Sequence, residues 1–246
     1  MIQDRPTPLM LRQISLLRDV EEALLQRMAG DMWIEHRRRG QHLADARQAD
    51  TGPFRDTAYF VFRGIVEIYS VTQHGGRKIL FFQGPGKLLN LNVMNTCGDN
   101  HYGRAAEDAI LLCMEREKLA DYVRCSPVLT AGLLAHYESK IWRLSHQLKN
   151  TAGTFFIERK LAAKLLKLSA DFGKPLGQGR VIAFDLTITQ LADYIGVPRE
   201  SVSRACRKLT ELQLISYENR RFYIPDQTRL EQFRRQIQGC ASKEET

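Results

Sequence analysis

The segment from Thr187 to Leu209 constrains the fold more than any other part of this sequence. Gly196 can adopt the positive φ angle that a tight turn between two helices requires. Pro198 suits the first turn of a second helix, where its missing N–H needs no partner. Apolar residues around this turn recur at helical spacing and supply one inner face: Leu191, Ile195, Val197, Val202 and Leu209. The segment therefore predicts two short helices packed around a turn, a helix-turn-helix.

Four polar residues are left on the outer face of the second predicted helix: Arg199, Glu200, Ser203 and Arg204. Arginine can pair bidentately with guanine, glutamate can accept a hydrogen bond from cytosine, and serine can bind a phosphate or a base edge. They lie near the N-terminal end of the helix, which reaches base edges in this docking mode. The alternative is a solvated, salt-bridged helix face, but the agreement of turn, inner face and outer face favours DNA reading.

A two-stranded wing is predicted directly after the second helix. Residues 212–217 and 221–224 are rich in β-forming side chains, and a polar turn joins them. The tip of this wing places Arg220 and Arg221 for contacts with phosphate. The whole chain has 36 Lys and Arg against 28 Asp and Glu, a net charge of +8, and this excess favours a polyanionic partner.

The first half of the chain reads as a small β-domain that follows a helix at residues 9–30. Residues 59–69, 78–82 and 109–114 have high β-propensity, and glycine-bearing turns separate them. A Gly84-Pro85-Gly86 sequence ends the second of these stretches. Several short strands with such turns predict a small antiparallel barrel or jelly roll.

A long helix is predicted between the β-domain and the helix-turn-helix. Five apolar residues alternate at spacings of three and four, the a/d seam of a heptad pattern: Leu134, Tyr137, Ile141, Leu144 and Leu148. The seam favours packing against a second copy, and packing on the chain's own β-domain is the alternative. Residues 151–154 form a small-residue hinge, and residues 173–179 a loop. We therefore predict a sensing domain at 1–127, a dimerisation helix and hinge at 128–154, and a DNA-binding domain at 155–246.

Several classes of protein are disfavoured. The chain shows no signal peptide and no apolar run long enough to span a membrane. Its five cysteines are odd in number and show no CxxC spacing, which indicates a reduced, cytoplasmic protein. Nucleophile–base motifs, phosphate loops and metal-ligand spacings are absent from the sequence, so we expect no enzyme, no metal site and no cofactor.

The string Pro198-Arg199-Glu200-Ser201-Val202-Ser203-Arg204, with residues 209–216 and the wing, resembles the DNA-binding signature of the Crp/Fnr superfamily of bacterial transcription regulators. Arg63-Gly64 and Gly84-Pro85-Gly86 extend the resemblance to the β-domain. It implies an α+β fold with a cyclic-nucleotide-binding-like jelly-roll barrel, a long dimerisation helix and a C-terminal winged helix-turn-helix. It also implies a homodimer that binds an effector between barrel and helix, reads an inverted repeat of TGTGA- or TTGA-like half-sites, and recruits or blocks RNA polymerase.

Departures from the family pattern limit the effector. Cyclic-nucleotide binders carry a Gly-Glu pair and a phosphate-neutralising Arg-Ser pair, whereas this chain has Gly86-Lys87 to Asn92 and, at the second position, Asp99-Asn100. A carboxylate opposes a bound phosphate, so cyclic AMP and cyclic GMP are disfavoured. The clustered N-terminal cysteines of the family's iron–sulfur oxygen sensors are also missing, since the first cysteine is Cys97.

The remaining candidates predict a pocket for a small polar or weakly acidic molecule, such as a phenol or carboxylate. Its expected residues are Asn90, Asn92, Asn100, His101, Tyr102, Tyr137, Lys140, Ile141 and Leu144. Residues 98–102 and 136–140 are similar to those of the family branch that senses halogenated aromatics. The alternative for these residues is that they are ordinary surface positions. The alternatives for the regulator are that it binds DNA without an effector, that it senses through haem held by histidines, or that redox chemistry of Cys97 or Cys113 controls it. A last alternative is a signalling module whose winged helix binds protein.

Overall fold

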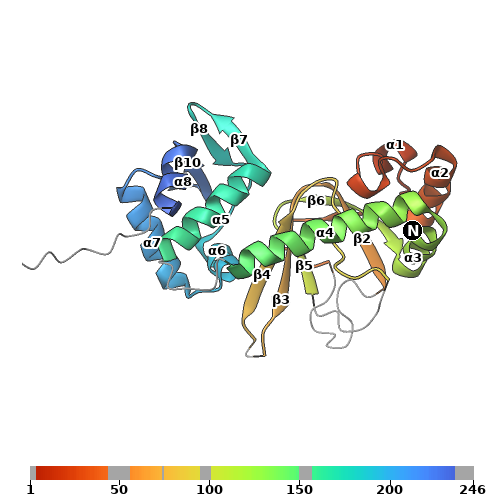
Figure 1. The fold of residues 1–246 in the computed structure, drawn as a ribbon, viewed down its shortest axis with the longest axis horizontal. Helices are drawn as coiled ribbons and strands as arrows, with labels where there is room; N and C mark the ends of the chain where they lie inside the picture. The colour runs from red at the N-terminus through yellow and green to blue at the C-terminus, as the bar shows by residue number, and fades with distance from the viewer. Residues whose placement is uncertain (1–3, 44–55, 74, 95–100, 150–156, 236–246) are drawn as a thin grey trace, which may run out of the picture. The chain divides into compact units, whose positions relative to one another are not determined.

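The computed structural model describes residues 4–43, 56–73, 75–94, 101–149 and 157–235. The chain divides into two units, Met1–Thr151 and Ala152–Thr246, each with its own core (Figure 1). The predicted hinge at 151–154 lies outside the described residues. The threefold division predicted from the sequence, with a separate segment at 128–154, stays a prediction.

The N-terminal segment forms three short helices where the sequence predicted one. They are α1 (Pro8–Leu11), a 3-10 turn (Ser15–Leu17) and α2 (Glu22–Asp31). Ile14 and Glu21 have extended backbones, which end one helix before the next begins. The Arg12 guanidinium donates hydrogen bonds to the backbone oxygens of Arg18 and Val20 at 2.9 and 3.4 Å. Most apolar residues of this segment are nevertheless buried, among them Leu11, Leu17, Leu25 and Met28, which is why the spacing resembled a single amphipathic helix.

Six strands of the first unit form two antiparallel three-stranded sheets. The first has the order β1 (Met32–Arg37), β6 (Ala109–Glu115), β2 (Thr57–Arg63), and the second β4 (Arg77–Gln83), β3 (Val66–Val71), β5 (His101–Ala105). Gly64, with φ +84°, separates β2 from β3, and a Cβ there would lie 2.3 Å from the Asp108 oxygen. The predicted stretch 59–69 is therefore two strands, and the second of them, β3, pairs antiparallel with β4. Among the described strands the two sheets do not close into one barrel.

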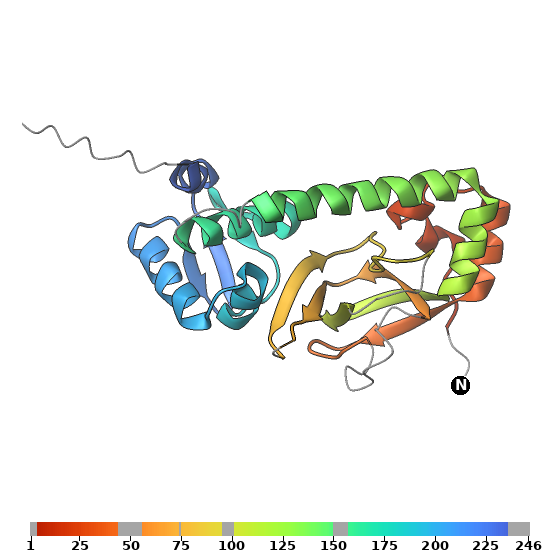
Figure 2. The same ribbon diagram turned by 60° about the horizontal axis from the view of Figure 1, so that its bottom comes forward.

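Alternation along the strands gives the first unit two apolar cores. Tyr59 and Val61 of β2 belong to a core that joins both sheets. Ala58 and Phe60 point to the opposite face, where the N-terminal helices, α3 (Arg116–Cys125) and α4 (Pro127–Lys149) cover the first sheet. Figure 2 shows α4 running along the strands, with α1, α2 and α3 gathered near its N-terminal end.

The second unit is a helical domain on a four-stranded sheet of order β7-β8-β10-β9. Its elements follow in chain order: α5 (Ile157–Phe172), β7 (Gly173–Leu176), β8 (Gly179–Ile182), α6 (Ile188–Ile195), α7 (Arg199–Glu211), β9 (Ser216–Glu218), β10 (Arg221–Ile224) and α8 (Gln227–Arg235). The prediction of a loop at 173–179 is wrong, because this segment forms the β7–β8 hairpin and pairs β8 with the wing strand β10. The predicted α+β class and winged helix-turn-helix are confirmed.

Candidate nucleic-acid interface

The helix-turn-helix has defined signals at its start and at its turn. At the start of α6 the Thr187 hydroxyl oxygen accepts from the Gln190 N–H at 3.1 Å, and the Gln190 side-chain oxygen accepts from the Thr187 N–H at 3.0 Å. This capping box satisfies two N–H groups that the helix itself leaves unpaired. At the turn Gly196 has φ +85° and donates its N–H to the Ala192 oxygen at 2.7 Å. Pro198 lies at the N-cap position of α7, directly before Arg199, and its side chain makes no capping hydrogen bond.

The inner face of α7 packs inside the second unit, as predicted. Val202, Ala205 and Leu209 are buried, and so is Cys206. The Lys208 ammonium lies 3.1 Å from a Glu158 carboxylate oxygen of α5. The Lys164 ammonium of α5 lies 3.9 Å from the centre of the Tyr194 ring of α6. The buried face and the Lys208–Glu158 pair hold α7 on α5, and the Lys164–Tyr194 contact joins α5 to α6.

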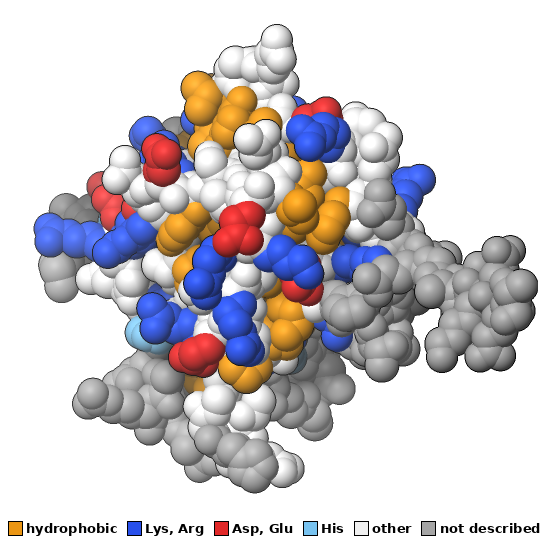
Figure 3. Space-filling view, turned by 90° about the vertical axis from the view of Figure 1, so that its left-hand side faces the viewer, with side chains coloured by type: hydrophobic (Ala, Val, Ile, Leu, Met, Phe, Trp, Pro, Cys, Tyr) orange, Lys and Arg blue, Asp and Glu red, His pale blue; other side chains and the backbone are white. Residues whose placement is uncertain are grey.

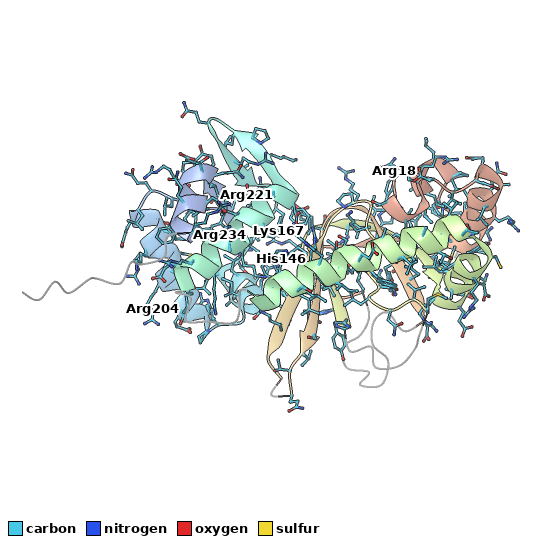
Figure 4. All side chains as sticks on the ribbon, viewed as in Figure 1. Arg18, His146, Lys167, Arg204, Arg221 and Arg234 are labelled. Atoms are coloured by element: carbon cyan, nitrogen blue, oxygen red, sulfur yellow. The ribbon has the colours of Figure 1, made fainter. Side chains whose placement is uncertain are left out.

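The outer face of α7 carries the four side chains that the sequence singled out. Arg199, Glu200, Ser203 and Arg204 are all exposed. Arg204 projects away from the body of the unit (Figure 4). Arg207 is also exposed and lies one turn beyond Ser203. Arg207 was not among the predicted contacts, although the helical spacing of 200, 203, 204 and 207 was the signal that could have found it. Figure 3 shows Lys and Arg side chains gathered among hydrophobic ones on this end of the unit.

The wing is tied to the loop that precedes α6. Its two-residue turn consists of Asn219 and Arg220, with φ +49° and +63°, the geometry of the turn that matches strand twist in hairpins. The Arg220 oxygen accepts from the Leu186 N–H at 2.7 Å, and the Tyr217 hydroxyl donates to the Leu186 oxygen at 3.2 Å. Arg220 and Arg221 are both exposed, and the Arg221 guanidinium lies 3.4 Å from the Asp185 carboxylate. The two arginines of the predicted wing contact therefore differ in environment.

Three of the predicted effector residues have hydrogen-bond partners within the chain. Asn90 is buried, and its amide accepts from the Tyr59 N–H and donates to the Thr57 oxygen, both at 2.9 Å. The Tyr137 hydroxyl accepts from the Val93 N–H at 3.0 Å. The Lys140 ammonium donates to backbone oxygens of residues 88–90. These three side chains hold the chain's own backbone together.

Other members of the predicted set lie elsewhere in the first unit. Tyr102 stacks on Tyr69 at 5.6 Å between ring centres, on the face of the second sheet opposite the inter-sheet core. Ile141 is 62% exposed, and Leu144 packs partly against the inter-sheet core. His101 and Asn92 are half-buried, and Asn100 lies outside the described residues.

The predicted seam of α4 divides in the same way. Leu134, Ile141 and the unpredicted Trp142 are about 60% exposed, whereas Tyr137 and Leu144 contact the chain's own domain. The side chain of Leu148 is outside the described residues. Tyr137 and Leu144 follow the alternative of packing on the chain's own domain, whereas pairing of the exposed residues with a second copy stays a prediction.

Two of the described cysteines, Cys113 and Cys206, are buried. Burial raises the pKa of the Cys206 thiol to about 12 and that of Cys113 well above its ordinary value, whereas reactive thiols have lowered pKa values. Cys97 lies outside the described residues. Within the described ranges no group of three or more His, Cys, Asp or Glu side chains could hold a metal ion. In the same ranges, no helix is long and apolar enough to cross a membrane.

Comparisons with known proteins agree with this geometry. Residues 159–233 match the Crp-like helix-turn-helix domain. A CRP-like cAMP-activated global transcriptional regulator of Mycobacterium tuberculosis is 23% identical over 176 residues, 71% of this chain and 78% of the relative. The nitrogen fixation regulation protein FixK of Rhizobium meliloti is 27% identical over 172 residues, 69% and 74% of the two chains. The structure of FixK2 from Bradyrhizobium japonicum covers 82% of this chain and 96% of its own, with a TM-score of 0.68 and 19% identity.

The fold, the exposed face of α7 and the wing define a DNA-binding transcription regulator of the winged helix-turn-helix class. Within this class the C-terminal unit carries the Crp-like helix-turn-helix domain, and the chain is similar to transcription regulators of the Crp/Fnr superfamily over about 70% of its length.

Proposed function

We propose that this regulator is a homodimer in the bacterial cytoplasm that binds an inverted DNA repeat and responds to a small-molecule effector. The exposed face of α7 carries the proposal. Arg199, Glu200, Ser203 and Arg204 lie on the first turns of the recognition helix, whose apolar residues are all turned inward. In this docking mode these turns enter the major groove, and half-sites lie one helical turn apart, about 34–36 Å.

Base reading follows from the chemistry of these side chains. Arg204 would pair with a guanine, Glu200 would accept from a cytosine, and Arg199 and Ser203 would add base or phosphate contacts. The resemblance to the superfamily suggests TGTGA- or TTGA-like half-sites. Arg220 and Arg221 at the wing would contact phosphate on either side of the half-site. Arg207 extends the face of α7 toward the same backbone.

The exposed row of α4 supports the homodimer. Leu134, Ile141 and Trp142 present apolar surface along the helix, which a second copy of the same helix would cover. A change in the packing of the two α4 helices, passed on through residues 151–154, would reposition the DNA-binding units and so recruit or block RNA polymerase.

The effector is proposed to be something other than cyclic AMP, although one relative carries activation by cAMP in its name. Leu88, Leu89 and Asn90 replace the charged turn of nucleotide binders, and all three are buried. A second candidate function is constitutive DNA binding, because Asn90, Tyr137 and Lys140 already have partners within the chain. Thermal unfolding of the first unit with candidate ligands separates the two, since a ligand of the folded state raises its stability.

Footprinting on the upstream region of the protein's own gene tests DNA reading. Arg204→Ala is expected to weaken the specific site by about 1–3 kcal/mol and to relax the sequence preference. The matched control is Lys174→Ala, because Lys174 is equally exposed but lies on β7, the sheet edge opposite the wing. An unchanged footprint with Arg204→Ala would exclude direct readout, and a protein partner for the winged helix would then be the better assignment.

A further inference from the structure

Lys140 is a buried lysine on the face of α4 that meets the sheets. The residue is 5% exposed. Its ammonium lies 3.3, 3.1 and 3.1 Å from the backbone oxygens of Leu88, Leu89 and Asn90. A lysine ammonium has three protons, so three converging carbonyls match its donors. Burying such a charge costs several kcal/mol unless hydrogen bonds compensate it, so a buried lysine in this geometry is a fixed structural contact.

The segment that receives Lys140 is itself held to the first sheet. The Val61 N–H donates to the Lys87 oxygen at 2.9 Å, and the Leu89 N–H donates to the Tyr59 oxygen at 2.8 Å. The Asn90 side chain completes the attachment through its two hydrogen bonds to the backbone of β2. The Lys140 ammonium therefore joins α4 to a segment that moves with β2.

Further polar side chains on α4 contact other segments of the first unit along the same row. The Tyr137 hydroxyl accepts from the Val93 N–H at 3.0 Å. The Gln147 amide donates to the Leu80 oxygen of β4 at 3.1 Å. Positions 137, 140 and 147 lie at helical spacings of three and seven and so share one face. Lys140 is the central and most deeply buried of the three.

We propose that Lys140 is a positioning residue that docks α4 on the sensing domain from within the chain, so that the dimer helix is set for DNA binding with no effector bound. The proposal rests on the proposed function, because it assumes that α4 carries the dimer seam. The Lys140 ammonium joins α4 to the segment of residues 88–90, so no ligand is needed to join them. An effector of this protein then acts on a helix that is already docked.

The test uses the full-length protein and an operator fragment that the unmodified protein selects from random DNA, with no ligand added. The unmodified protein is expected to bind this fragment, and Lys140→Met to bind it at least tenfold more weakly. The affinity of Lys140→Met for non-specific DNA should not change, because the substitution lies outside the DNA-binding unit. Lys87→Met is the matched control, since Lys87 is an exposed lysine next to the same segment and its loss should leave operator affinity unchanged.

Chemical rescue separates positioning from a general loss of folding. The Lys140→Ala substitution removes the part of the lysine side chain beyond Cβ, which the propylammonium ion reproduces. Adding n-propylammonium chloride should therefore restore operator affinity, and sodium chloride at equal ionic strength should not. Far-ultraviolet circular dichroism identifies any variant that fails to fold, and Lys140→Arg, which keeps a cation, then serves as the second variant.

Three results would overturn the inference. They are unchanged operator affinity in Lys140→Met, a loss that neither propylammonium nor Lys140→Arg restores, and an unmodified protein that selects its operator only after a ligand is added. A failure of the proposed function looks different. In that case the unmodified protein would select no sequence, or Arg204→Ala would bind the selected fragment as well as the unmodified protein does.

Discussion

At the scale of single residues, His136 predicts how acid affects the first unit. This α4 histidine lies among apolar and cationic groups, and burial, with Lys140 and Lys87 nearby, lowers its pKa from 6.5 to about 3. Between pH 6.5 and 3 the unfolded chain therefore binds a proton that the folded chain does not, and the free energy of unfolding falls as the pH falls. At pH 5 the loss relative to neutral pH is about 2 kcal/mol. Urea unfolding followed by circular dichroism at pH 7 and pH 5 measures it.

The control for this prediction is His136→Asn. Asparagine keeps a short amide that can replace the hydrogen bond of the imidazole to the Asn90 backbone, and it does not titrate. The difference in stability between the variant and the unmodified protein should change by about 2 kcal/mol between the two pH values, in favour of the variant at pH 5. An equal pH dependence of both proteins would show that His136 is not the group responsible.

Arg220 combines an unfavourable backbone with an exposed charge. Its φ of +63° disfavours any side chain with a Cβ, by about 1–2 kcal/mol relative to glycine. Arg220→Gly should therefore raise the stability of the DNA-binding unit while weakening DNA binding on all sequences and reducing the salt slope by about one. Thermal unfolding and a salt titration of DNA affinity measure the two effects, and the proposed phosphate contact is wrong if the salt slope does not change.

At the scale of elements, the turn of the helix-turn-helix depends on the conformation of Gly196. Its φ of +85° is left-handed, so Gly196→Ala is expected to destabilise the DNA-binding unit by about 1 kcal/mol and to lower its melting temperature by several degrees. Gly30→Ala is a control of opposite sign, because Gly30 lies inside α2 without a positive φ, and the space that an added methyl group would occupy is open. There alanine should stabilise slightly. Differential scanning calorimetry of the two units checks both signs.

The elements also show what the sequence could and could not predict. The turn at Gly196 and the inner face of α7 were readable because local conformational demand and apolar spacing agree there. The 9–30 segment misled because apolar spacing reports burial and does not report the extended backbone at Ile14. The β7–β8 hairpin depends on pairing with β10, which is some forty residues away, and no local pattern records such a partner.

The candidate pocket shows the same limit. Asn90, Tyr137 and Lys140 have the side chains of a polar binding site, and residue type alone favours that interpretation. Their hydrogen bonds to the backbone of residues 57–59, 93 and 88–90 come from contacts between distant segments. A helical spacing of three and four residues likewise cannot say which of two adjacent rows meets the sheets. Only the packing of α4 separates Tyr137 and Leu144 from Leu134 and Ile141.

At the scale of the whole molecule, the exposed row of α4 predicts how assembly and DNA binding are linked. Ile141→Glu places a charge in the middle of the proposed dimer seam, where burying it without a partner costs several kcal/mol. We expect the dimer dissociation constant to rise at least tenfold, with a similar loss of affinity for an inverted repeat and no loss for a single half-site. Sedimentation velocity and titrations on both DNA fragments measure these quantities.

The matched control for the seam is Leu9→Glu, because Leu9 in α1 is 74% exposed and Ile141 is 62% exposed. Both substitutions place a carboxylate on a solvent-facing apolar residue, so both should leave the folded protomer intact, and only Ile141→Glu should change assembly. Two half-sites bound by one dimer share a single association cost, which is why loss of the dimer should affect the inverted repeat alone. If Ile141→Glu remained a dimer with unchanged affinity for the repeat, then the exposed row of α4 would not be the surface that pairs the two recognition helices.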